Sequence, residues 1–246
     1  MMDLWSLIWW LIELIFMPQI FIPLIYPGLV AVLVILLTII WLERKIAAKI
    51  QLRYGPLYVS KPIGGALQLL ADALRFLFQE IIVPVDADKV VFLVVPVLSM
   101  LIALTPIVFI PPYPGVYAVK VEYNLLMVLA LGSITPITLI AIAWAANNKF
   151  TIIGGLREAF MTIAYEASLM LATLSMAILY GSLSIEEIIY AQKIPGILLN
   201  PLAAIVFFVA MLMSSGKLPF DIVEGEQEIV AGPFTEYTGI IYGLNP

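Results

Sequence analysis

Residues 24–42 read LIYPGLVAVLVILLTIIWL and contain no charged side chain. A helix needs about 20 apolar residues to cross roughly 30 Å of hydrocarbon. The whole chain has the same character, because 63% of its 246 residues are hydrophobic and only 12% are charged. An ordinary soluble domain is roughly half apolar and about one quarter charged. The composition therefore excludes a soluble enzyme and a disordered chain, and it predicts a polytopic membrane protein.

Further apolar stretches predict an all-α fold, a polytopic transmembrane helix bundle in which residues 1–246 form a single membrane domain. The first 22 residues are apolar but are interrupted by Glu13, Pro18 and Pro23, so they form either an extra span or a segment at the membrane surface. After a first clear span at 24–42, we expect spans near 90–110, 123–146, 159–180 and 197–214, and the start of another at 237.

The reactive and charged residues narrow the chemistry. The chain has no Cys and no His, which excludes disulfides, Cys/His metal sites and His-dependent catalysis. We therefore expect no catalytic residue, metal or cofactor on this chain, and any redox centre must belong to another subunit. The net charge of −5 argues against nucleic acid as a partner. Five of the twelve Lys and Arg residues lie between positions 44 and 61, so this loop should be cytoplasmic in a multi-pass protein of the cell (plasma) membrane.

Residues 64–81 are apolar but carry polar side chains at helical spacing. Asp72, Arg75 and Gln79 fall on one face of such a helix, and the Gly64–Gly65 pair stands at its start. The pattern predicts an amphipathic helix at or just inside the membrane surface. An ordinary interfacial anchor is the alternative to a functional polar face.

Two glutamates lie beside and within the span expected at 159–180. An ionised side chain in hydrocarbon costs about 2.5–3.5 kcal/mol on insertion scales, so it usually faces a cavity or a partner. Glu158 and Glu166 are about two helical turns apart and could line one polar track. We interpret them as part of a proton or ion relay, and a single structural Glu hydrogen-bonded within the bundle is the alternative.

A second acidic group lies at 218–237, which reads LPFDIVEGEQEIVAGPFTEY and has no basic residue. Carboxylates packed in a low dielectric raise one another's pKa values, so they can hold protons near neutrality. The residues between them are mostly apolar, which is not typical of a solvated acidic loop, the alternative interpretation. Alternation of the spans places this acidic loop in the cytoplasm. It is predicted to continue the relay through Asp221, Glu224, Glu226, Glu228 and Glu236.

Four motifs together resemble a known family. They are ERK-x(5)-Q-x-R-x-GP at 43–56, GG-x(2)-Q-x(3)-D-x(2)-R at 64–75, R-x(7)-YE at 157–166 and PFD-x(2)-E-x-E-x-E at 219–228. In this order they are similar to the membrane subunit that anchors the peripheral arm of respiratory complex I, and to its counterpart in energy-converting membrane-bound hydrogenases.

The resemblance implies a membrane-anchor and energy-coupling subunit that is not itself redox-active. The implied partners are iron–sulfur and hydrogenase-like peripheral-arm subunits, antiporter-like membrane subunits and the lipid bilayer. Iron–sulfur clusters and a NiFe or other redox centre would lie on those partners, and the relay would start the movement of protons or sodium ions. The resemblance also implies an arm-facing cavity formed by Glu43, Arg44, Arg53, Asp72, Arg75 and Arg157.

Two branches of this family differ in their electron acceptor. The EQE and GPF-TEY-G sequences look more like ferredoxin-dependent hydrogenases and archaeal sulfur reductases than like quinone enzymes, which commonly read PFD-L-x-E-x-ESE. The expected function is therefore coupling in a membrane-bound hydrogenase or sulfur reductase. The alternative is a quinone-chamber subunit of a complex I-type NADH or F420H2:quinone oxidoreductase. The chain ends at Pro246, so the last two spans of the family are expected to be absent.

An independent secondary transporter and a purely structural anchor are the rival classes. A transporter would be expected to show inverted repeats, and we see none in the sequence. A structural anchor would leave Glu166 and the acidic loop without an explanation.

Overall fold

The computed structural model describes residues 13, 16–25, 28–113, 115–216, 219–220, 230 and 232–244. In these residues the chain is helical and contains no strand, apart from an isolated bridge between Tyr113 and Val116. The contacts divide the chain into two compact units, Met1–Ile81 with Thr238–Gly243 and Ile82–Tyr237 with Leu244–Pro246. The all-helical class is confirmed, and the single membrane domain stays a prediction.

The described residues of the first unit form four helices: α2 (Pro18–Leu24), α3 (Leu29–Ile50), α4 (Gln68–Phe78) and α13 (Gly239–Gly243). Helix α4 packs against both α3 and α13. The rings of Phe76 and Tyr242 stack with their centroids 5.9 Å apart. Gly239 has φ +60°, and a Cβ built on it would lie 2.8 Å from the carbonyl oxygen of Gln79, so only glycine fits where α13 begins.

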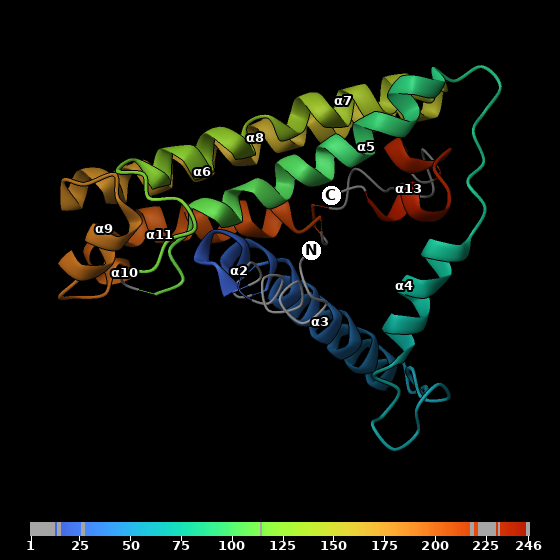
Figure 1. Ribbon diagram of the computed structural model, residues 1–246, viewed down its shortest axis with the longest axis horizontal. Coiled ribbons are helices and arrows are strands. Elements are labelled where there is room, and N and C mark those ends of the chain that lie inside the picture. The colour runs from blue at the N-terminus through green and yellow to red at the C-terminus, as the bar shows by residue number, and fades with distance from the viewer. Residues whose placement is uncertain are drawn as a thin grey trace, which may run out of the picture. The chain divides into compact units, whose positions relative to one another are not determined.

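The second unit is built around one long helix, α8 (Lys149–Tyr180), against which α7 and α11 pack. In Figure 1 helices α6 and α7 follow one another, and α7 packs against α8. The other described elements of this unit are α5 (Lys89–Leu104), η1 (Thr105–Phe109), α6 (Asn124–Gly132), α7 (Thr135–Ala145), α9 (Ile185–Ala191), α10 (Gly196–Leu199), α11 (Pro201–Ser214) and η2 (Gly232–Phe234).

Local sequence signals fix the ends of α8. The side chain of Asn148 accepts a hydrogen bond from the Phe150 amide at 2.9 Å and so caps the first turn. At the other end Gly181 takes the left-handed conformation with φ +69°, and the Ser182 amide bonds back to the Ala177 carbonyl. The cap at Asn148 explains why α8 begins at Lys149, ten residues before the expected span at 159–180.

Four segments of the described chain are long and apolar enough to cross a membrane: Pro18–Ile50, Lys89–Phe109, Asn124–Ala145 and Lys149–Tyr180. They correspond in position to the first four spans expected from the sequence. Helix α4 begins at Gln68 rather than at residue 64, because Gly64 and Gly65 have φ values of +63° and +79°, which no right-handed helix allows.

The fifth apolar stretch, expected as one span at 197–214, is divided between α10 and α11. Pro201 has no amide hydrogen to continue α10, and it drives the preceding residue, Asn200, out of the helical region to φ −137°, ψ 72°. Helix α11 then has 14 residues and a length of about 21 Å, which is shorter than the hydrocarbon layer.

The close approach of α7 and α8 generates a stability prediction. A Cβ built on Gly155 would lie 2.2 Å from the Cβ of Ala143, so Gly155→Ala must push the two helices apart. We expect a destabilisation of roughly 1–3 kcal/mol, typical of overpacking. Denaturation of the purified protein by SDS titration would measure it. Ala164→Val, which adds carbon to an exposed position of α8, should change stability little; equal effects of the two variants would contradict the close packing.

Candidate functional site

A polar pocket of about 580 Å³ lies in the first unit, where α3 ends and α4 begins. It contains four of the six residues that the sequence assigned to the arm-facing cavity, Glu43, Arg44, Arg53 and Asp72. Ile40, Ala47, Gly55, Pro56 and Gln68 complete its lining. The pocket therefore gathers side chains from two of the recognised motifs, ERK-x(5)-Q-x-R-x-GP and GG-x(2)-Q-x(3)-D-x(2)-R.

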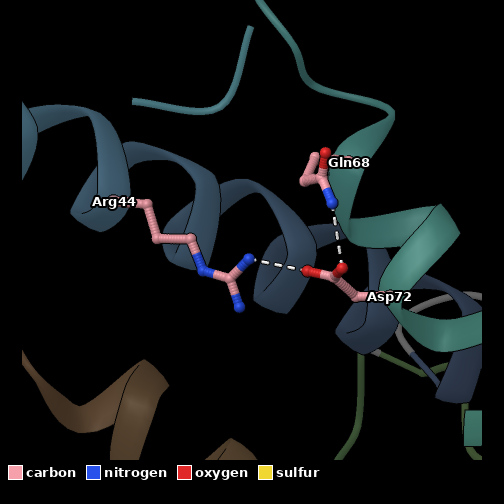
Figure 2. Close-up of polar contacts among 3 residues, drawn as sticks. All are labelled: Arg44, Gln68 and Asp72. Carbon is pink, nitrogen blue, oxygen red and sulfur yellow. Dashed lines mark hydrogen bonds and ion pairs between the residues drawn. The ribbon is translucent and has the colours of Figure 1, made fainter. Parts of the chain in front are cut away.

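The centre of the pocket is a three-residue network, shown in Figure 2. Arg44 of α3 donates from Nη1 to Oδ2 of Asp72 at 2.6 Å. Gln68, one turn before Asp72 on α4, donates from Nε2 to Oδ1 at 3.0 Å. Both carboxylate oxygens of Asp72 are thus engaged, and the network ties α3 to α4. Gln68 was not among the predicted site residues, although its i, i+4 spacing to Asp72 places it on the same face.

The electrostatics of this network keep Asp72 ionised. The hydrogen bond from Arg44 is the largest influence and lowers the pKa of Asp72 below its ordinary value of 3.8, against the opposing effect of burial. The side chains of Arg44 and Asp72 are 48% and 30% exposed, so the pair contributes about 1 kcal/mol or less to stability. The ion pair therefore matters less for the stability of the fold than for holding two opposite charges at fixed positions in the pocket.

The other two arginines of this unit are held differently. Leu52 has φ +54° and turns the chain at the end of α3, so that the Arg53 amide bonds to the Ala48 carbonyl. The Arg53 side chain donates from Nε to Oε1 of Gln51 at 2.7 Å while it lines the pocket. Arg75 does not line the pocket, but its charge helps to lower the pKa of Asp72.

In the second unit, α8 carries Arg157, Glu158 and Glu166, each partly buried. The carboxylate of Glu166 faces the end of α6, because a Cβ built on Gly132 would lie 3.8 Å from its Oε1. Helix α6 ends at Gly132 and α7 begins at Thr135, so Glu166 lies beside an interruption between two helices.

Hydroxyl groups accompany these glutamates along α8. The Thr162 hydroxyl donates to the backbone carbonyl of Glu158 at 2.8 Å. The Tyr165 hydroxyl interacts with the side chains of Thr162 and of Ser214, the last residue of α11. Polar groups therefore occupy the turn between Glu158 and Glu166. Ser214 and Gly132 could not have been found from the sequence, because only the fold brings them to α8.

The segment that follows the acidic loop is attached to the second unit. Gly232 approaches α8 so closely that a Cβ on Gly154 would lie 2.6 Å from its Cα. The Tyr237 hydroxyl donates to the Ile142 carbonyl at 2.8 Å, and its ring stacks on Phe92 at 4.2 Å. These contacts anchor the segment on α5, α7 and α8.

Glu236 is the member of the predicted acidic group whose contacts the structure describes. Its Oε1 accepts a hydrogen bond from Nδ2 of Asn148 at 2.5 Å. The same Asn148 caps α8, so Glu236 lies at the N-terminal end of the helix that carries Glu158 and Glu166. A carboxylate at this position is stabilised by the helix dipole. Asp221, Glu224, Glu226 and Glu228 lie outside the described residues.

The fold and the site define a multi-pass membrane protein that holds carboxylates and arginines within or beside its spanning helices and has no Cys or His to bind a redox centre. A family model described as NADH dehydrogenase matches residues 24–245. The chain therefore belongs to this family, the complex I membrane-subunit family, as the four motifs indicated.

Individual relatives agree with this assignment. An NADH-quinone oxidoreductase subunit of Dehalococcoides mccartyi (strain CBDB1) is 39% identical over 213 residues, which are 87% of this chain and 60% of that protein. An F(420)H(2) dehydrogenase subunit of Methanosarcina acetivorans is 40% identical over 215 residues, 83% of this chain and 61% of the relative. An NADH-quinone oxidoreductase subunit of Rhodothermus marinus is 36% identical over 90% of this chain and 68% of the relative. The chain thus spans about 60% of the length of the first two of these relatives.

The charge network predicts how Asp72 titrates. Replacing Arg44 by Gln should raise the pKa of Asp72, because it removes the strongest of the lowering influences; Arg75→Gln should raise it less, because Arg75 exerts the weakest. Carboxyl ¹³C shifts of labelled aspartate would follow the titration, with Asp72→Asn to assign the signal. Since the pKa is lowered, the stabilisation is present above the unfolded value and is lost only below about pH 4. A larger shift in the Arg75 variant would contradict the network.

Proposed function

We propose that this chain is the membrane-anchor and energy-coupling subunit of a multi-subunit, ion-pumping oxidoreductase. The single observation that carries the proposal is the placement of Glu158 and Glu166 on the long α8 helix of a chain that has no Cys or His to hold a redox centre. Carboxylates in or near a membrane span are costly, so a protein keeps them where they move or balance charge.

The relay is proposed to run along α8. Glu158 and Glu166 are separated by about 12 Å of helix, which is too far for direct proton exchange. Thr162 and Tyr165 supply hydroxyl groups on the intervening turn. The interruption between α6 and α7 lies beside Glu166, and irregular backbone at membrane depth is tolerated where it is buried in protein or lines a water-filled cavity.

The acidic loop is proposed to feed this relay. Gly232 rests on Gly154, one turn before Glu158, and Glu236 is bonded to the cap of α8. These contacts support a coupling of the loop to α8, in which Asp221, Glu224, Glu226, Glu228 and Glu236 exchange protons or respond to charge. Antiporter-like membrane subunits would receive the relayed energy and move protons or sodium ions.

The polar pocket is proposed to face the peripheral arm. Glu43, Arg44, Arg53 and Asp72 share one cavity, and Arg75 influences its charge. Arg157 belongs to the other unit, and its role toward the peripheral arm is proposed from the family resemblance alone. Fixed charges of both signs suit docking of a polar protein surface and sensing of a change in charge on it. The partners would be iron–sulfur subunits of the arm in the plasma membrane complex.

The electron acceptor can be argued in two ways. The NADH-quinone oxidoreductase relatives of Dehalococcoides mccartyi and Rhodothermus marinus favour a quinone-linked enzyme, in which the quinone would be a substrate at the pocket. The EQE and GPF-TEY-G sequences favour the ferredoxin-dependent hydrogenases or sulfur reductases. The native complex, supplied in turn with NADH, reduced F420 and reduced ferredoxin, would decide. Quinone reduction supports the first branch, and hydrogen or sulfide without quinone turnover supports the second.

Glu166→Gln should leave assembly intact and reduce ion pumping at least about tenfold, the effect of removing a proton-transfer group. Pumping would be measured with the native complex in proteoliposomes, as ions moved per electron. Glu187→Gln is the matched control. Glu187 lies on the short helix α9, accepts a hydrogen bond from the Ser182 hydroxyl and is no part of the proposed relay. Pumping at the full rate in Glu166→Gln would remove this residue from the relay.

A second prediction concerns the acidic loop. Replacing Glu224, Glu226 and Glu228 together by Gln keeps the shape of these side chains and removes their charge. We expect normal assembly and a loss of coupled turnover, because uncharged amides cannot pass protons. Blue-native gels would report assembly, and the same proteoliposome assay would report coupling. Unchanged activity with normal assembly would give the loop a docking role instead.

A further inference from the structure

A largely apolar groove of about 490 Å³ lies between α8, α9, α10 and α11 in the second unit. Its lining shares no residue with the proposed relay or with the polar pocket. Its walls include Met176 of α8, Ile188 of α9, Ile197 of α10, and Ala204 and Phe207 of α11.

The groove is a consequence of the broken fifth span. Because the helix stops at Asn200 and restarts at Pro201, α10 and α11 do not form one continuous rod along α8. Gly196 allows α10 to rest directly on α8, since a Cβ there would lie 2.3 Å from Cε of Met176. The small side chains of Ala203 and Ala204 leave space along α11.

The surface around the groove is apolar as well. Leu198 and Leu202 are 70% and 72% exposed, and Ile205 on the next turn of α11 is 62% exposed. Helix α8, which forms the opposite wall, is one of the membrane-capable segments. A groove with such an apolar lining and such apolar surroundings suits an acyl chain better than it suits water.

One end of the groove is polar. Gln192 lines it, and its Nε2 would lie 2.9 Å from a Cβ on Gly196. The exposed Lys193 follows immediately. The two carboxylates of α9 have other partners. Glu186 accepts a hydrogen bond from the Gly115 amide at 3.1 Å, and Glu187 accepts one from the Ser182 hydroxyl at 2.5 Å. Within the described ranges, no ion pair involves Lys193. An amide donor and an ammonium group therefore remain for an anionic ligand.

We propose that this groove binds a phospholipid, with one acyl chain along α11 and the phosphate at Gln192 and Lys193. The combination of a thin apolar groove and hydrogen-bond donors with positive charge at one end matches the two parts of such a molecule. A helix of another subunit fits less well. A helix is about 10–12 Å wide and rises 1.5 Å per residue, so about four of its residues would fill the groove.

The test uses the native complex in nanodiscs of phosphatidylcholine with a small fraction of phosphatidylglycerol that carries a diazirine at the end of one acyl chain. After irradiation, labelled peptides are mapped by mass spectrometry. The expected result is labelling concentrated on the groove residues of α8 and α11, relative to the exposed α3 residue Ile35 as an internal reference. Labelling no stronger than at Ile35 would overturn the proposal.

Two variants make the test specific. Ala204→Phe fills the groove and should lower labelling there about tenfold, equivalent to about 1.4 kcal/mol of binding free energy. Leu202→Phe, on the exposed face of the same helix, is the control and should not lower it. Lys193→Gln should lower labelling about fivefold at low salt, as expected for one lysine beside anionic phosphate, whereas Lys149→Gln at the other end of α8 should not.

A photoreactive side chain at Phe207 keeps the test decisive if Ala204→Phe does not assemble. Cross-links from this position to lipid support the proposal. Cross-links to a peptide of another subunit would show that a helix occupies the groove and would overturn it.

Discussion

The constraint on which this structure depends is the cost of placing charge and unpaired backbone groups in hydrocarbon. Four described segments satisfy it as long apolar helices, and the charged side chains collect in a few places. Arg44 and Asp72 neutralise one another where α3 meets α4. Glu236 lies at the start of α8, where the helix dipole and Asn148 stabilise it. Glu166 lies on a membrane-capable helix without such a fixed counter-charge in the described interactions, and this is why we propose it as a proton carrier.

Breaks in helices give this protein its specific sites. The interruption between Gly132 and Thr135 lies beside Glu166, and there the Ile134 amide bonds to Leu131, three residues back instead of four. The break at Asn200–Pro201 shortens α11 and opens the apolar groove. Turns at Leu52 and at Gly64–Gly65 bring Arg53 and Gln68 to the polar pocket. In each case a local backbone feature, rather than the long helices, decides which side chains meet.

Much of this arrangement could be predicted from the sequence. The composition of the uncharged run at 24–42 is enough to predict a membrane span. The helical spacing of Gln68, Asp72 and Arg75 is enough to predict an amphipathic helix. The division of the fifth span could have been predicted too, because Pro201 carries the signal. The contact of Gly155 with Ala143, the bond between Asn148 and Glu236, and the approach of Gly132 to Glu166 could not, because they join positions distant in the chain that only tertiary packing brings together.

We propose that a carboxylate on α8 changes its protonation state when electrons pass through the complex. Redox-triggered infrared difference spectroscopy of the native complex, with ¹³C-labelled glutamate, would detect this change. We expect a protonated-carboxyl band that changes with electron transfer, shifts on ¹³C labelling and disappears in Glu166→Gln. A difference spectrum in which this band is the same in the wild type and in Glu166→Gln would contradict it.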